Sequence, residues 1–212
     1  MFALFALFTL ANVSGIESDA EESRKRAIDF EVPAYFPSDW EAVEAQYTLI
    51  KSMPRSTQTE ARRVDALYDN IKDAYDSLFR KAIPLYAQAA EDEIISVRRE
   101  LIRTGFAAFF PKYLRNPDAA ALAALGQYEA KDYYKARDTA SLALSEYETL
   151  FIGARVFIAR NELAEFGFTI DVLGGIDKIA REAIIEYEAG NKDTAAAYAR
   201  EALLRYNSLL KT

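Results

Sequence analysis

One stretch of the sequence occurs twice in similar form, and this repeat constrains the fold more than any other feature. Residues 124–150 align with residues 183–209 at a constant offset of 59, without a gap. The identical pairs are Ala124/Ala183, Tyr128/Tyr187, Glu129/Glu188, Ala130/Ala189, Ala136/Ala195, Ala140/Ala199, Ala143/Ala202, Leu144/Leu203, Tyr147/Tyr206 and Leu150/Leu209. Such a repeat predicts two copies of one supersecondary unit, each of which helps to cover the apolar face of the other.

The identical positions after residue 135 recur at steps typical of one helical face. They are Ala136, Ala140, Ala143, Leu144, Tyr147 and Leu150, with small side chains first and large ones last. Small side chains let two helix backbones approach closely. The pattern therefore predicts antiparallel helix hairpins near 117–150 and 176–210, with turns at Lys131–Asp132 and at Gly190.

Helices are expected through most of the remaining chain, because half of the residues are apolar while Gly and Pro are scarce. Three capping-box patterns, Ser18 with Glu21, Ser38 with Glu41 and Thr57 with Glu60, predict helix starts. Pro84 is expected to kink or break the third helix near Lys81. The further helices are predicted at 117–130 (with a start at Asn116–Pro117), 133–150, 152–166, 175–189 and 192–210; residues 168–175 form the one strand-like segment.

In "QYEAKDYYKARDTASLA" and "EYEAGNKDTAAAYAREA" the chain resembles the tetratricopeptide repeat (TPR). Ala136 and Ala143, with Ala195 and Ala202, fall on the two signature alanines of the second TPR helix. Alanine replaces the signature glycine at residues 124 and 183, and the copies lie 59 residues apart where TPR units adjoin at about 34. The segment "PAYFPSDWEAVEAQY" resembles a third copy more loosely. The expected fold is all-α, with antiparallel helix hairpins stacked as a TPR-like bundle or short solenoid over residues 16–212 as a single domain.

The resemblance implies a scaffold that binds a protein or peptide in a groove lined by the first helices of the hairpins. Carried over by position, Tyr128, Glu129, Tyr187 and Glu188 face or flank that groove. Tyrosine offers a large, stiff contact surface, and glutamate attracts a basic partner. The alternative is that both tyrosines only fill the space between helices while the glutamates are solvated.

The absence of His and Cys excludes zinc sites built on those ligands, Cys nucleophiles, His-based triads and disulfides. A net charge of −7 argues against binding of nucleic acid through its phosphates. The chemistry left to an enzyme is a carboxylate pair or a Ser–Lys nucleophile. One Ser-x-x-Lys spacing occurs, Ser208 to Lys211, without the Ser-Asp-Asn and Lys-Thr-Gly motifs that accompany it in Ser–Lys enzymes. We therefore expect no catalysis, no metal and no cofactor. The alternatives are a helical peptidoglycan-active enzyme that uses a carboxylate, and a small-ligand-binding partner of a transporter.

Residues 1–15 begin with an apolar run that is too short to span a bilayer but suits a signal peptide. No Lys or Arg precedes the run, so a packed first helix is the alternative. Export to the periplasm or envelope of a bacterium is the expectation, with another envelope protein or peptide as the partner. Membrane association through the N-terminus and the oligomeric state are left open.

Three further groups of residues are expected to have a structural role. The aromatic connector, Phe106, Phe109, Phe110 and Tyr113, is expected to pack against the long helix, with a partner- or membrane-docking patch as the alternative. Trp40 is expected to be a core anchor. Arg98, Arg99 and Arg103 lie near a helix C-terminus, where the helix dipole favours cations.

Overall fold

The computed structural model describes residues 2–211, with side chains from residue 15 onward. These residues form helices and no strand, which confirms the all-α prediction. The chain divides between residues 88 and 89 into two compact units, which are described separately. A single domain over residues 16–212 stays a prediction.

The first unit contains α1 (Phe2–Asp29), α2 (Val32–Tyr35), α3 (Pro37–Lys51) and the first part of α4 (Gln58–Arg103). Its core is rich in tyrosine: the buried residues are Ala20, Tyr47, Ile50, Val64, Tyr68, Ile71 and Tyr75. Trp40 is half-buried against this core, with its ring centroid 5.2 Å from that of Tyr75, as expected of a core anchor.

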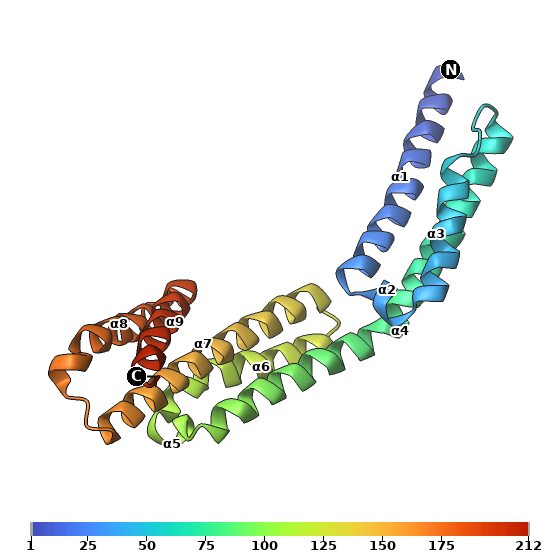
Figure 1. Ribbon diagram of the computed structural model, residues 1–212. Coiled ribbons are helices and arrows are strands. Elements are labelled where there is room, and N and C mark those ends of the chain that lie inside the picture. The colour runs from blue at the N-terminus through green and yellow to red at the C-terminus, as the bar shows by residue number, and fades with distance from the viewer. Residues whose placement is uncertain (1, 212) are drawn as a thin grey trace. The chain divides into compact units, whose positions relative to one another are not determined.

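The second unit begins in the last part of α4 and continues through α5 (Phe106–Phe109), the 3₁₀ helix η1 (Pro111–Leu114), α6 (Arg115–Glu129), α7 (Tyr133–Glu165), α8 (Ile170–Glu188) and α9 (Lys192–Leu209). Within it, α6 lies beside α7 and α8 beside α9 (Figure 1). The helix α7 also packs against α9, so the two hairpins share one interface.

Both repeated stretches form helix hairpins with the same turn. Lys131 and Gly190, 59 residues apart, adopt left-handed backbone conformations with φ of 62° and 85°. One residue further, the amide of Asp132 donates to the carbonyl of Gln127 at 2.9 Å, and the amide of Asn191 donates to Glu186 at 2.8 Å. The alanines predicted to allow close helix approach, Ala136, Ala140, Ala143, Ala195, Ala199 and Ala202, are all buried.

A recurring triad of arginine, carboxylate and tyrosine links the helices of each hairpin to the helix before it. The first triad is Arg24, Glu44 and Tyr75; the second is Arg98, Asp118 and Tyr147; the third is Arg160, Asp177 and Tyr206. In each triad the tyrosine hydroxyl donates to the carboxylate and the arginine pairs with it. The three members come from three successive long helical segments, so each carboxylate ties three helices together.

The helix that carries each arginine also ends in the same way. The residue seven positions after the arginine, Glu31, Gly105 or Gly167, has a positive φ of 57°, 77° or 88°. Its amide donates to the carbonyl three residues earlier at 3.0, 3.0 and 3.1 Å. The same three-helix arrangement therefore occurs three times, once in the first unit and twice in the second.

Several predicted helix boundaries were wrong. One helix, α7, covers the predicted helices 133–150 and 152–166, and α8 begins at Ile170, inside the segment predicted as strand-like. Ser18 lies within α1, because the helix extends through the apolar run before it. The helix α3 begins at Pro37, before the predicted cap Ser38, and it has no side-chain cap. Proline suits the first helical position because it has no amide hydrogen that would need an acceptor.

Two helices accommodate proline without the predicted boundary. The helix α4 continues through Pro84, which directly follows the buried residues Ala82 and Ile83, so burial of its apolar face outweighs one lost hydrogen bond. The helix α6 begins at Arg115 rather than at Pro117, which lies in the first turn where amides have no helical acceptor.

The third predicted capping box is present. The Thr57 amide donates to Oε2 of Glu60 at 2.9 Å, and the Glu60 amide donates to Oγ1 of Thr57 at 3.2 Å. We expect Thr57→Ala to lower the free energy of unfolding by about 1 kcal/mol in urea denaturation. Thr59→Ala, an exposed change in the same helical turn, should have at most half that effect, and equal losses would argue against the cap.

The second triad makes a pH-dependent contribution to stability. The hydrogen bond from Arg98, helped by that from Tyr147, holds the pKa of Asp118 below its ordinary value, although burial opposes the shift. A carboxylate with a lowered folded-state pKa stabilises the fold above the unfolded-state pKa of about 3.9, and this stability is lost as the pH falls through the folded-state pKa.

Accordingly, we expect Asp118→Asn to lower the free energy of unfolding by about 1–2 kcal/mol at pH 7, and the deficit to shrink as the pH falls below about 4. Urea denaturation at a series of pH values measures this. Asp138→Asn, which removes a largely exposed carboxylate on α7, is the matched control and should change stability little at any pH. A deficit that is independent of pH would contradict the assignment.

Candidate binding cavity

A cavity of about 460 Å³ lies within the second unit, between α7, α8, α9 and the segment formed by α5 and η1. The residues that line it are mostly apolar: Phe106, Phe110, Tyr113, Thr149, Leu150, Gly153, Val156, Phe157, Arg160, Ile170, Gly174, Asp177, Ala180, Arg181, Ala183, Ile184, Tyr187, Ala195, Ala199 and Tyr206. Along α8 they recur at three- and four-residue steps, so one face of this helix forms a wall.

Two helical glycines help to create the space. A Cβ atom added at Gly153 on α7 or at Gly174 on α8 meets no atom within 4 Å. The position 62 residues before Gly153, the separation between Arg98 and Arg160, is Glu91. The position 59 residues before Gly174, the separation between the two hairpins, is Arg115, and both of these residues carry long side chains. The cavity around the third triad therefore depends on short side chains where the related helices have long ones.

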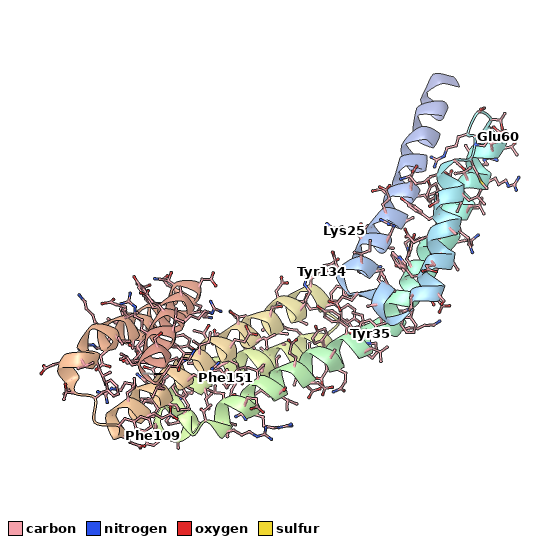
Figure 2. All side chains as sticks on the ribbon, in the orientation of Figure 1. Lys25, Tyr35, Glu60, Phe109, Tyr134 and Phe151 are labelled. Atoms are coloured by element: carbon pink, nitrogen blue, oxygen red, sulfur yellow. The ribbon has the colours of Figure 1, made fainter. Side chains whose placement is uncertain are left out.

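Aromatic rings form one end of the cavity. The rings of Phe110 and Phe157 meet edge to face at 5.4 Å, and those of Tyr113 and Tyr187 at 5.8 Å. Edge-to-face pairs are a favoured packing geometry, so these rings hold each other in place. Phe109, labelled in Figure 2, is 67% exposed and contacts Phe157 with ring centroids 5.6 Å apart.

The predicted packing of the aromatic connector is thus correct for part of it. Phe106 is buried, Phe110 and Tyr113 are half-buried, and all three line the cavity, whereas Phe109 lies largely in solvent.

The polar side chains of the third triad form part of the lining. The Tyr206 hydroxyl donates to Oδ1 of Asp177, and Nε of Arg160 lies 3.5 Å from the same oxygen. Burial and the bond to Asp177 raise the pKa of Tyr206, so its hydroxyl stays protonated and remains a donor. Arg181, one turn after Asp177, donates from Nε to the Asp177 carbonyl at 3.3 Å.

Of the four residues predicted to form a partner-binding groove, Tyr187 lines the cavity. Burial raises its pKa, and the nearby Glu146 carboxylate raises it further. Glu188 is exposed beside the rim, where its Oε1 accepts from Lys112 Nζ at 2.9 Å and from the Tyr113 hydroxyl at 2.8 Å. These two bonds lower the pKa of Glu188. Tyr128 and Glu129 lie at the end of α6 and do not line the cavity.

Arg98 has a specific partner that the helix dipole alone did not suggest. Its Nε lies 2.7 Å from Oδ1 of Asp118, and its Nη2 lies 3.2 Å from Oδ2. Residues Arg160, Asp177, Arg181, Gly153 and Gly174 were not among the predicted site residues. A sequence signal exists for one of them: "RRELIRTGF" at 98–106 and "RNELAEFGF" at 160–168 share Arg, Glu, Leu, Gly and Phe, which relates Arg160 to Arg98.

Within residues 2–211 the side chains that the structure describes contain no cluster of three or more acidic residues placed to hold a metal ion. Among the described residues, no helix has the length and apolarity required to cross a membrane. Comparison of the chain with protein-family models, with curated proteins and with solved structures finds no match.

Proposed function

We propose that this chain is a non-catalytic binding scaffold, built from TPR-like helix hairpins, that holds the apolar part of a ligand in the cavity of its second unit. The cavity is the observation that carries the proposal. Ligand sites are typically concave, mostly apolar and about 300–1,000 Å³ in volume, with a few polar groups that fix orientation. The volume of about 460 Å³ and the single polar cluster at Arg160, Asp177 and Arg181 match this description.

The TPR-like arrangement is supported by the two hairpins and the alanines between their helices. In the TPR resemblance the ligand groove is faced by the first helix of each hairpin. Here α8 is the first helix of its hairpin, and its cavity-facing residues run from Ile170 to Tyr187. Export to a bacterial envelope remains a prediction that rests on residues 1–15, nearly all of whose side chains lie outside the described part of the chain.

A small molecule is the ligand class that the lining favours. Each peptide group that enters an apolar site carries an amide and a carbonyl, and either one costs free energy if it has no hydrogen-bonding partner. Away from the polar cluster the lining supplies few such partners: the Thr149 hydroxyl, for example, already donates to the Ser145 carbonyl at 2.9 Å. The hydrocarbon part of a small molecule has no polar groups that need hydrogen-bonding partners.

Filling the cavity tests this function. Gly174→Leu places a branched side chain in the open space, whereas Gly175→Leu adds the same side chain on an exposed face of the same helix. We expect the neutral apolar dye Nile red to bind the wild-type protein and Gly175→Leu with similar affinity, and Gly174→Leu at least tenfold more weakly, in a fluorescence titration.

Thermal melts establish that each variant is folded, and Gly153→Leu fills the cavity independently from α7. Dye binding that survives in folded Gly174→Leu and Gly153→Leu would contradict the cavity as the binding site. A native ligand can be sought directly by mass spectrometry of small molecules that co-purify with the wild-type protein and are missing from Gly174→Leu.

A protein or peptide partner, the class predicted from the sequence, is the second candidate. Its support is the cluster of exposed apolar residues where α7 connects to α8: Phe166 is 75% exposed, Ile170 74% and Val172 52%. Exposed apolar groups of this kind are common at protein interfaces.

If the tyrosines of the predicted groove bind such a partner, the double variant Tyr128→Ala/Tyr187→Ala should reduce its capture in a crosslinking pull-down, with helicity unchanged by circular dichroism. Tyr134→Ala, a change of an exposed tyrosine on α7, serves as the control. Undiminished capture by the double variant would remove these tyrosines from the interface.

A further inference from the structure

The polar part of the cavity lining carries more positive than negative charge. Two arginines, Arg160 and Arg181, belong to it, and Asp177 is the one carboxylate among the lining residues that the structure describes. Asp177 already accepts the Tyr206 hydroxyl. Two arginines and one carboxylate give this part of the lining a formal net charge of +1, beside a mostly apolar space.

Arg160 is held more loosely than the arginines of the other two triads. Arg24 makes two hydrogen bonds to Glu44, of 2.7 and 2.8 Å, and Arg98 makes two to Asp118, of 2.7 and 3.2 Å. The nearest nitrogen of Arg160, Nε, lies 3.5 Å from Oδ1 of Asp177, which is too long for a strong hydrogen bond. Its guanidinium therefore retains donors for another anion.

Arg181 has no equivalent around the other triads. The position 59 residues earlier is Leu122, and the residue four after Glu44 is Thr48. In the described part of the chain no carboxylate forms an ion pair with Arg181, which donates to the backbone carbonyl of Asp177. The third triad is thus the one with a cavity, a loosely held arginine and an added cation.

The apolar part of the lining extends from this cluster toward the aromatic end. Asp177 and Tyr187 are ten residues apart on α8, which corresponds to about 15 Å along the helix axis. Between them the wall of α8 presents Ala180, Ala183 and Ile184, and α7 contributes Leu150 and Gly153 to the same lining. The space suits an elongated hydrocarbon chain with an anionic group at one end.

We propose that this cavity binds a medium-chain carboxylic acid, with its carboxylate against Arg181 and Arg160 and its hydrocarbon chain directed to the aromatic end. The inference rests on the proposed binding function and names the chemistry of the ligand. A planar carboxylate matches the paired donors of a guanidinium, and a single negative charge balances the net charge of the cluster.

Decanoate and 1-decanol, which share a ten-carbon chain and differ in charge, test the inference by isothermal titration calorimetry at pH 7.5, below the concentration at which decanoate forms micelles. We expect wild-type protein to bind decanoate at least tenfold more tightly than decanol. Arg181→Gln should remove most of this preference by weakening decanoate binding, with decanol binding unchanged.

Lys178→Gln is the matched control, because it removes the same charge from an exposed position on α8 that does not line the cavity. It should keep the preference for decanoate. A loss of preference in Lys178→Gln equal to that in Arg181→Gln would overturn the inference, since a general field of positive charge would then explain it.

The remaining outcomes separate the inference from the proposed function. Equal binding of decanoate and decanol, lost for both in Gly174→Leu, overturns the carboxylate and leaves cavity binding intact. If neither decanoate nor decanol binds, but other apolar compounds still displace Nile red from the cavity, the carboxylic-acid inference is also overturned. Failure of Nile red, decanoate and decanol alike to bind in the cavity overturns both proposals.

Discussion

The contact between one carboxylate, an arginine and a tyrosine is the interaction on which the rest of the structure depends. Partly buried charge is unfavourable unless it is paired and hydrogen-bonded. In the first two triads the arginine fork and the tyrosine hydroxyl together supply the donors that Glu44 and Asp118 need, and they lower the pKa of each carboxylate. Because the three members come from three helical segments, satisfying one carboxylate also fixes how these segments pack.

In each arrangement, the helix that carries the triad tyrosine has buried residues at the same spacing, but the side chains at these positions differ. Val64, Tyr68, Ile71 and Tyr75 occupy in the first unit the steps that Ala136, Ala140, Ala143 and Tyr147 occupy in the second, and that Ala195, Ala199, Ala202 and Tyr206 repeat. Bulky residues fill the core of the first unit, while alanines let the helices of the hairpins approach closely. The same arginine–carboxylate–tyrosine contacts thus occur both beside the filled core of the first unit and beside the cavity of the second.

The parts of the fold and of the candidate site that could be predicted are those that leave a regular pattern in the sequence. The hairpins were predictable because their copies align without a gap, so Ala136 and Ala195 or Tyr147 and Tyr206 match directly. The first triad was not, because its hairpin has two more residues between carboxylate and tyrosine and replaces alanines with Val64 and Ile71. Of the candidate site, Tyr187 was predicted; Arg181 and Gly174 were not, since a cavity arises from packing and leaves no periodic pattern.

The proposed ligand site would account for the two glycines that line the cavity. Glycine inside a helix costs about 0.5–1 kcal/mol relative to alanine, and Gly153 and Gly174 both have room for a Cβ. A chain selected for stability alone would gain from larger side chains at both positions. Both glycines lie near the triad whose arginine is most loosely held, beside Arg181, so the proposed binding role would offset this cost in stability.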